Sequence, residues 1–551
     1  MYRLFMPLVI AVLIFLGNYD EPHYTIMIYM NGSDLESEWG AATDDLAEML
    51  DSGIRVRNAN VLIMTGGTEH WMNTAIPETE VVIWQLKDGK INELESLGKV
   101  NMGNPNTLRD FIKFSTANFP AEKYGLIMWD HGGGSIAGFG YDEKFAGSSL
   151  TLLDMQQAFE ESGLRETPLE FLGFDACLMA TVEMAVIASD YARVLIAAED
   201  LEPADGWDYR FLSALNKNPQ ICGFALGEII VDTFIDFYGK NSDEILTLSV
   251  IDLSQISPVM DTMGNLAAKL NTDTNFQALA IRRANTKTFG EGSPRDNYAD
   301  MVDIGDMAMQ LMDLYPNEAL AIVDALLNCV TYNRHNADVE LFGLSTFYIY
   351  GGKSEGESSL GIYSNLNMDD NYTNYLYDFF NALNYHAFTH AYTHTELVLW
   401  KPVSQNIYRM EGLLQTDHID DFLWPRLNNH PVILFPIATT ATIRQYAIPM
   451  CINGNDADII VIFSNEYPYG KIKGIRHNSA NVFQRGYDPI SPTDEMAIFY
   501  PQHNFLTGET VWYKGETFTL DKEAKLEWHP APSTHELGLR HTDICCEYQY
   551  S

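Results

Sequence analysis

Short apolar runs alternate with amphipathic stretches along the first half of this sequence, and the alternation limits the folds open to the chain. The apolar runs occupy residues 24–30, 60–65, 80–86, 124–129, 169–174, 193–198 and 246–251. Helical patterns lie between several of them, at residues 41–50, 107–117 and 150–161. Strand and helix patterns in this order predict a mostly parallel sheet with helices on both faces. The expected fold class is therefore α/β.

Local signals sharpen parts of this pattern. Thr151 stands directly before an apolar-periodic stretch, which predicts a helix start with Thr151 or Ser149 as its cap. Residues 255–340 show mainly helical patterns, and residues 343–350 form one more strand pattern. The helical character thus continues well beyond the first half of the chain.

A change of pattern near residue 390 divides the chain. Short strand patterns separated by Pro, Asn and Gly replace the helical ones, at residues 397–400, 432–437, 459–463, 510–513 and 517–520. A chain of 551 residues is also too long for a single core. We therefore predict an α/β domain over residues 21–388 and a separate β-rich accessory domain over residues 389–551.

The N-terminus has the parts of an export signal. Arg3 supplies a positive charge, residues 4–17 are mainly apolar, and residues 18–22 are mainly polar. This run is short for a membrane span, so residues 1–20 predict a secretory signal peptide or an N-terminal anchor. We expect an exported protein, secreted, periplasmic or at the cell surface, that contacts a membrane only if this segment is retained.

Acidic residues strongly outnumber basic ones. The sequence has 75 Asp and Glu against 34 Lys and Arg, which gives a net charge of −41. Phosphate binding needs a basic surface, so this balance argues against nucleic acid as a partner. An acidic surface would attract cationic peptides or ions, but a merely solvated surface accounts for the charge more simply. The six cysteines are sparse and irregularly spaced, which is not a disulfide framework, and no Cys-x-x-Cys pair predicts a zinc site.

Two of the predicted strands lead into residues capable of proton and thiol chemistry. The run at 124–129 is followed by His131 and three glycines, and the run at 169–174 leads to Cys177. Open α/β sheets place their sites at the C-terminal ends of strands. A thiol needs a neighbouring base, and imidazole suits that task near neutral pH. The pair predicts a Cys/His hydrolase, with the backbone amides of Gly132 and Cys177 as the oxyanion hole.

Several segments resemble the clostripain family of cysteine peptidases, in the family's order. They are residues 24–36, 129–134, 138–143, 174–180, 198–209 and 343–348, and they fall within residues 24–385. The resemblance implies the caspase-like fold shared with gingipains and legumains. It makes His131 the catalytic histidine and Cys177 the nucleophile, a dyad that acts through a thioester. Residues 21–388 would then be an endopeptidase domain that cleaves protein or peptide substrates after Arg or Lys.

Cleavage after a basic residue requires carboxylates in the specificity pocket, because a carboxylate pairs with guanidinium or ammonium. Asp175 is the first candidate, since strand alternation would place it on the same side as Cys177 if the strand extends that far. Asp205, in the loop between Pro203 and Trp207, is the second candidate. Local turn capping accounts equally well for Asp175, and a solvated loop position accounts for Asp205.

Relatives in this family are often activated by a cut between the histidine and the cysteine. Lys144 and Arg165 are the only basic residues in that interval. We predict Lys144 as an autoprocessing site, although the longer linker that the family cuts is absent. Some relatives need calcium, which stays open as a cofactor here, but no Asp-x-Asp-x-Asp-Gly loop assigns metal ligands.

Two other functions stay open at this point. The chain could be an inactive peptidase-like protein that binds peptide, glycan or a cell surface through residues 389–551. It could also hydrolyse a non-peptide amide. The presence of both His131 and Cys177 favours catalysis over binding, and the family resemblance favours peptide bonds.

Overall fold

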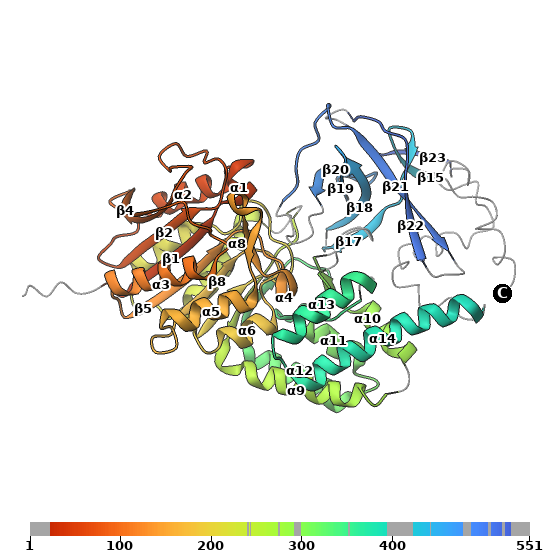
Figure 1. Ribbon diagram of the computed structural model, residues 1–551, viewed down its shortest axis with the longest axis horizontal. Helices are drawn as coiled ribbons and strands as arrows, with labels where there is room; N and C mark the ends of the chain where they lie inside the picture. The colour runs from red at the N-terminus through yellow and green to blue at the C-terminus, as the bar shows by residue number, and fades with distance from the viewer. Residues whose placement is uncertain are drawn as a thin grey trace, which may run out of the picture.

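An α/β part, a group of helices beside it and a β-rich part make up the computed structural model (Figure 1). The structure describes residues 22–239, 242, 244–273, 276–290, 299–350, 353–393, 423–440, 442–477, 486–504, 509–520 and 524–530. The predicted export segment at residues 1–20 and the predicted strand at residues 397–400 lie outside the described residues. Within the described residues, no helix is both long enough and apolar enough to cross a membrane.

A nine-stranded sheet with the order β13-β10-β9-β8-β5-β1-β2-β3-β4 forms the centre of the α/β part. Its strands are β1 (Tyr24–Asn31), β2 (Ala59–Gly66), β3 (Val81–Lys87), β4 (Lys90–Gly98), β5 (Lys123–Trp129), β8 (Phe171–Asp175), β9 (Val194–Ala197), β10 (Thr247–Asp252) and β13 (Val330–His335). The central strands β2, β1, β5, β8 and β9 are parallel. Antiparallel strands extend the sheet at both edges. This arrangement confirms the predicted mostly parallel sheet.

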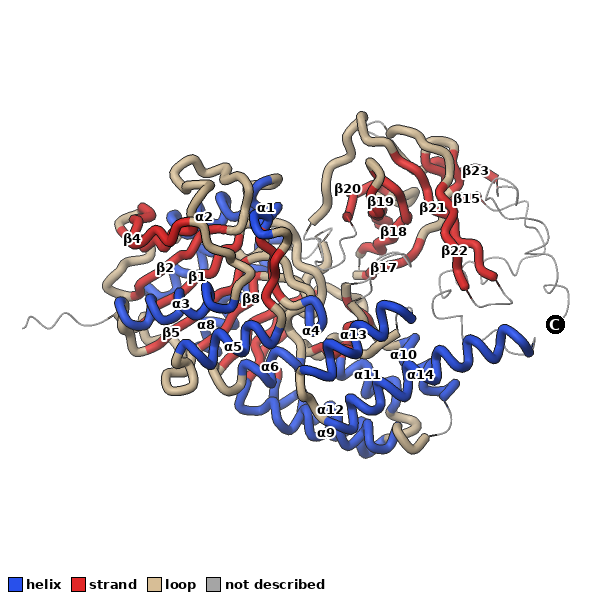
Figure 2. The backbone as a smooth tube through the Cα atoms, viewed as in Figure 1, coloured by secondary structure: helices blue, strands red, loops and turns tan. Residues whose placement is uncertain are grey.

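Helices cover both faces of the sheet (Figure 2). One face carries α3 (Pro105–Asn118), α5 (Leu152–Ser162) and α6 (Val182–Ala188), and the other carries α2 (Ala41–Asp51) and α8 (Gly223–Tyr238). Successive side chains of a strand point to opposite faces. In β1, Met27 and Tyr29 join the core of the first face, and Ile26 and Ile28 join the core of the second. Burial on both faces explains why the apolar runs are continuous rather than alternating.

Local sequence determines where two of these helices begin. The Asn104 side chain accepts a hydrogen bond from the Asn106 N–H at the start of α3, and Pro105 takes the first helical position. Thr151, one of the two predicted caps, forms a capping box with Asp154 at the start of α5. Both helices therefore begin where a side chain satisfies the free N–H groups of the first turn.

A further group of helices packs against the face that carries α3, α5 and α6. These helices are α9 (Ile256–Leu270), α10 (Phe276–Asn285), α11 (Ile304–Leu311), α12 (Pro316–Cys329), α13 (Lys353–Asn365) and α14 (Asp370–Thr393). Their apolar side chains share one core cluster with that face. A small sheet of β11 (Thr288–Phe289), β12 (Met301–Asp303) and β14 (Ser345–Phe347) lies with them, and β14 falls within the strand predicted at residues 343–350.

Short elements complete this part of the chain. They are α1 (Ser33–Ser37), α4 (Gly134–Ala137), α7 (Ser213–Lys217), β6 (Phe139–Asp142), β7 (Ser148–Leu150) and the 3-10 helices η1 (Glu143–Phe145), η2 (Tyr209–Leu212) and η3 (Leu253–Gln255). Strands β6 and β7 pair as an antiparallel hairpin soon after β5. Since α1 directly follows β1, both α1 and this hairpin lie at the edge of the sheet where the parallel strands end.

The C-terminal part is rich in β-structure, as predicted. Its strands are β15 (Leu423–Leu427), β16 (His430–Pro431), β17 (Phe435–Thr439), β18 (Ile443–Ile452), β19 (Asn455–Ser464), β20 (Lys471–His477), β21 (Met496–Asn504), β22 (Glu509–Lys514) and β23 (Glu527–Pro530). They form a six-stranded and a three-stranded sheet around a core of their own, which includes Ile448, Ile459 and Val461. The predicted strand at 517–520 is reduced to a single bridge between Phe518 and Met496.

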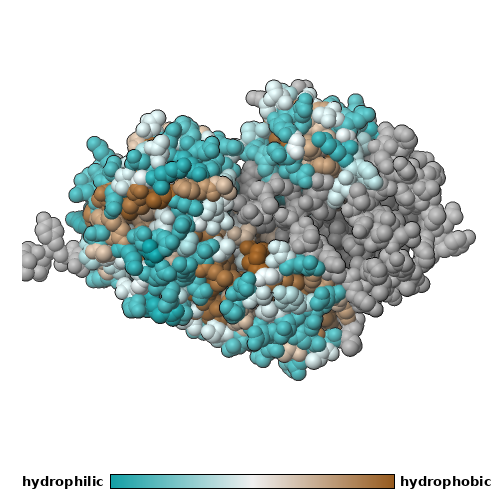
Figure 3. Space-filling view, viewed as in Figure 1, coloured by the Kyte–Doolittle hydropathy of each residue, from teal (hydrophilic) through white to brown (hydrophobic). Residues whose placement is uncertain are grey.

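Hydrophilic residues predominate over the face of the α/β part seen in Figure 3, in keeping with the acidic excess of the sequence.

Helix α14 runs past residue 388, where the sequence pattern placed the end of the first domain. The domain boundaries themselves stay a prediction.

Candidate active site

His131 and Cys177 follow two neighbouring parallel strands at matching positions. Strands β5 and β8 pair in the register Trp129 opposite Asp175, so the second residue after each strand reaches the same level of the sheet edge. The Asp130 N–H donates to the carbonyl oxygen of Asp175 at 3.4 Å, which continues the pairing beyond the strands. The structure thus brings the two predicted segments together. Both side chains are buried, with 1% of His131 and 0% of Cys177 exposed.

The backbones of Gly132 and Cys177 are in direct contact. A Cβ atom added to Gly132 would lie 1.9 Å from the carbonyl oxygen of Cys177 and 3.0 Å from its nitrogen. Only glycine fits this approach, because a real Cβ atom does not come within 3 Å of another heavy atom. The two amides predicted as oxyanion donors therefore belong to backbone segments that touch.

The turn after Cys177 is held by the neighbouring strand end. Leu178 has a positive φ of 64°, and its N–H donates to the carbonyl oxygen of Asp200 at 3.1 Å. The Ala180 N–H donates to the carbonyl oxygen of Ala198 at 2.8 Å. The segment that follows β9 thus fixes the backbone of the loop that carries the thiol.

Asp34 binds the catalytic histidine candidate and was missed by the sequence reasoning. Its Oδ1 lies 2.7 Å from His131 Nε2, and the Tyr141 ring stacks on the imidazole at 5.5 Å between centroids and 16° between planes. Burial alone would raise the pKa of Asp34, but the charge and hydrogen bond of His131 hold that pKa well below its usual range. Asp34 lies in α1, directly after β1, the neighbour of β5. A polar segment after a buried strand was the signal that could have indicated it.

Asp130 fixes the backbone of the histidine. Its carboxylate accepts hydrogen bonds from the Ser33 hydroxyl and the His131 N–H, both at 2.7 Å, from the Tyr141 N–H at 2.9 Å, and from the Asn31 amide. Burial raises the pKa of Asp130 to about 7, although its hydrogen bonds and the nearby imidazole act in the opposite direction. This side chain links β1, β5 and the β6–β7 hairpin at one point.

The thiol of Cys177 lies against the loop that follows β9. The Glu202 N–H points at the sulfur, with 3.1 Å between nitrogen and Sγ. The Glu202 carboxylate in turn accepts a hydrogen bond from the Trp207 indole at 3.3 Å. The loop formed by residues 199–209 therefore passes directly beside the candidate nucleophile.

The two predicted specificity aspartates occupy different environments around this loop. Asp175 is fully buried, and its carboxylate accepts hydrogen bonds from the Tyr209 hydroxyl at 3.0 Å and the Trp207 N–H at 3.3 Å. Strand β8 ends at Asp175, so strand alternation does not extend to Cys177. Asp205 is exposed in a turn of the same loop. In this conformation Asp175 holds the loop through buried hydrogen bonds, and Asp205 is exposed to solvent on the same loop.

Lys144 lies in η1, between β6 and β7. Its ammonium group donates to the backbone oxygen of Glu78, and burial lowers its pKa against the attraction of nearby carboxylates. Ala146 and Gly147, which follow closely, are exposed and both have positive φ. The predicted processing bond is thus in a surface hairpin, with its lysine side chain tied to a neighbouring loop.

Among the described residues, no group of three or more His, Cys, Asp or Glu side chains is arranged to hold a metal ion. Calcium therefore stays an expectation of the family resemblance, with no ligands assigned to it.

Comparison with known sequences matches the chain to the clostripain family. The sequence profile of the clostripain family matches residues 28–403. Clostripain from Hathewaya histolytica is 25% identical over 190 residues, which are 29% of this chain and 35% of that protein. The chain thus spans about a third of the length of this curated relative.

The solved structures that are similar to the chain include two C11 proteases. One is an inactive zymogen of a C11 protease from Parabacteroides distasonis, with 20% identity, a TM-score of 0.49, and coverage of 63% of this chain and 97% of that one. The other is a secreted C11 cysteine protease from Bacteroides thetaiotaomicron in complex with an irreversible peptide inhibitor, with 16% identity, a TM-score of 0.48, and coverage of 63% and 99%.

The contact between Gly132 and Cys177 predicts the effect of one methyl group. Gly132→Ala should lower the free energy of unfolding by roughly 1–3 kcal/mol, because the strand ends must separate to admit the Cβ atom. Gly361→Ala is the matched control, since a Cβ atom there meets nothing within 4 Å. Chemical denaturation of both variants measures the difference. Equal stability of Gly132→Ala and the wild type would contradict the packing described above.

Proposed function

We propose, since this chain belongs to the clostripain family, that it is a cysteine endopeptidase with Cys177 as nucleophile and His131 as its acid–base partner. One observation carries the proposal: the segments of these residues meet at one sheet edge, with Gly132 packed on the Cys177 backbone. An imidazole and a thiol on adjacent strand ends supply the base and the nucleophile that amide hydrolysis needs.

The proposed reaction is acyl transfer through the thiol. The Cys177 thiol gives its proton to His131 as the sulfur attacks the scissile carbonyl carbon, and the electron pair of the C=O bond moves to oxygen. The N–H groups of Gly132 and Cys177 stabilise this oxyanion. As the C–N bond breaks, His131 donates a proton to the leaving amine and an acyl thioester remains. His131 then accepts a proton from the water that attacks the thioester, and it returns this proton to the sulfur as the C–S bond breaks, which releases the acid product, ionised in water, and the thiol.

Asp34 serves this chemistry as a positioning residue. Its carboxylate lies 2.7 Å from His131 Nε2, so it fixes the ring orientation and favours the protonated imidazole that the leaving amine requires. The ring of Tyr141 stacks on the face of the His131 imidazole. The histidine is thus held by a charge and by an aromatic face, and both come from segments at the same sheet edge.

The proposed substrates are proteins or peptides with Arg or Lys at the cleaved position. The loop of residues 199–209 passes beside Cys177 and carries several carboxylates, which suit a cationic side chain. We assign Asp205 to this recognition as an exposed member of the loop. Asp175 would contribute its buried negative charge from beneath the loop, through the contacts with Trp207 and Tyr209.

Export and self-processing complete the proposed function. The apolar N-terminal segment supports export to a secreted, periplasmic or cell-surface location. The Lys144–Phe145 bond has the basic residue that such an enzyme would accept, and the hairpin that carries it lies at the surface. Calcium is kept as a candidate cofactor to be tested by its addition and removal.

Substitution of the nucleophile tests the central claim. Cys177→Ala should abolish hydrolysis of peptides with Arg or Lys at the cleaved position, and Cys222→Ala, which changes an exposed cysteine, should retain it. Cleavage of a positional-scanning peptide library is the measurement. A lysine- or arginine-directed electrophile should label Cys177. Full activity of Cys177→Ala would overturn the mechanism, and an unlabelled Cys177 in an inactive protein would favour the peptidase-like binding protein.

Removal of the Asp34 charge tests the positioning role. Asp34→Asn should lower kcat by about 10- to 100-fold with a smaller change in KM, because the ring loses its anionic partner. The histidine-dependent limb of the pH profile should also move to lower pH, which a merely structural defect would not cause. Asp44→Asn, an exposed carboxylate of α2, is the control. An unchanged pH profile would show that Asp34 does not act through His131.

Self-processing has a direct test on gels. The wild type should be cut after Lys144, and Cys177→Ala and Lys144→Ala should both stay intact, whereas Arg165→Ala should be cut like the wild type. Mass spectrometry of the fragments identifies the bond. Identical intact bands for the wild type and Cys177→Ala would exclude self-cleavage at Lys144.

A further inference from the structure

The candidate dyad has almost no accessible surface in this structure. Cys177 is 0% exposed and His131 is 1% exposed, so a peptide has no path to the sulfur. The β-rich C-terminal part lies against the same edge of the α/β part, beside the loop of residues 199–209 and beside α1 (Figure 1). The contacts between the two parts therefore bear on how a substrate reaches the site.

On the cysteine side, a turn of the C-terminal part packs against the loop beside the thiol. Gly486 has a φ of +78°, and a Cβ atom added there would lie 2.6 Å from the Cβ of Ala204. Ala204 is close in the chain to Glu202, whose N–H donates to the Cys177 sulfur at 3.1 Å. The C-terminal part therefore contacts this loop close in sequence to the backbone N–H that binds the Cys177 sulfur.

An ion pair crosses the same contact. The Lys473 ammonium of β20 lies 2.6 Å from a carboxylate oxygen of Glu244, and the two side chains are 18% and 22% exposed. Arg476, on the same strand, pairs with Asp458 of its own part at 3.4 Å. Lys473 thus connects β20 directly to the α/β part.

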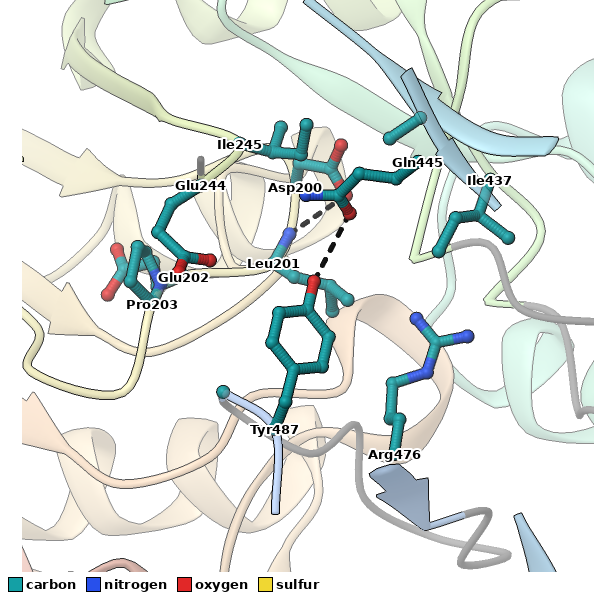
Figure 4. Close-up of a pocket in the computed structure, with 12 residues that line it drawn as sticks. Asp200, Leu201, Glu202, Pro203, Glu244, Ile245, Ile437, Gln445, Arg476 and Tyr487 are labelled. Carbon is teal, nitrogen blue, oxygen red and sulfur yellow. Dashed lines mark hydrogen bonds between the residues drawn. The ribbon is translucent and has the colours of Figure 1, made fainter. Parts of the chain in front are cut away.

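The two parts fit closely around this ion pair. The cavity next to Glu244 has a volume of about 30 Å³, with room for about one water molecule. Asp200, Leu201, Glu202 and Glu244 line it from the α/β part, and Gln445, Arg476 and Tyr487 line it from the C-terminal part (Figure 4). We call Asp200, Glu202 and Glu244 the acidic rim.

On the histidine side, the same C-terminal part reaches the residues that directly follow α1. A cleft of about 340 Å³ has Glu38 and Trp39 on one wall and His477 and Asp488 on the other. His477 pairs with Asp488 at 3.1 Å, and this hydrogen bond raises the pKa of His477 against its burial, with help from the charges of Asp488 and Glu38. Because Glu38 and Trp39 directly follow α1, which carries Asp34, the C-terminal part lies near the segments that hold both members of the dyad.

We propose that the C-terminal β-rich part is a built-in inhibitor, which docks strand β20 on the acidic rim and must move away before a basic substrate can enter. A basic strand on an acidic surface beside the nucleophile has the charge of the substrates proposed above, so the two compete for one surface. The inhibitor role rests on the proposed function, but the docking contact itself can be measured without peptidase activity.

Reversal of the charges across the contact provides the test, in the full-length chain. Lys473→Glu and Glu244→Lys each place like charges at the contact, and each should speed alkylation of Cys177 by iodoacetamide roughly tenfold. The double variant restores opposite charges and should return the rate to that of the wild type. Arg444→Glu makes the same charge change at an exposed position of β18 and should have no effect. Mass spectrometry of the Cys177 peptide measures the rate and separates it from the other cysteines.

Cleavage of an Arg or Lys peptide is followed in the same four variants and should rise with alkylation in Lys473→Glu, which keeps the acidic rim intact. Faster alkylation without peptide cleavage would support the docking contact but contradict the proposed peptidase function. Wild-type rates of alkylation and cleavage in both single variants would overturn the inhibitor and leave the peptidase function standing. Fast alkylation that persists in the double variant would also overturn the proposal, because it would indicate damage to the fold rather than loss of the ion pair.

Discussion

The parallel pairing of β5 with β8 is the contact on which the site depends. Its register sets Trp129 opposite Asp175, and the pairing continues through the backbone of Asp130. Glycine at position 132 then lets the histidine segment rest on the carbonyl group of Cys177. A shift of one residue in this register would move the imidazole and the thiol to opposite faces of the sheet edge, so sheet formation and site assembly are a single event.

Much of the fold could be predicted because its signals are local. Continuous apolar runs indicated the parallel strands, and Thr151 indicated the start of α5, since both depend on residues close in sequence. The adjacency of His131 and Cys177 also followed, because both come after predicted strands of one parallel sheet. Strand order and register were beyond local signals, yet the two residues needed only neighbouring strands to meet.

The parts that sequence reasoning missed depend on contacts between distant segments. Asp34 is 97 positions from His131 and takes its role from the adjacency of β1 and β5. For Asp175, the prediction required strand alternation to continue as far as Cys177. Strand β8 instead ends at Asp175, and the carboxylate of this residue turns toward Trp207 and Tyr209. The approach of Lys473 to Glu244 joins two separately packed parts, and no periodicity in either segment encodes it.

The stacking of Tyr141 on His131 links catalysis to the continuity of the chain. Tyr141 belongs to β6, and Lys144 lies in the connection between β6 and its partner β7. Scission of that connection would free the C-terminal end of β6, while the Tyr141 backbone would still be held by its hydrogen bonds with Asn31 and Asp130. Cleavage of the hairpin would then change how firmly the Tyr141 ring holds the imidazole of His131 in place.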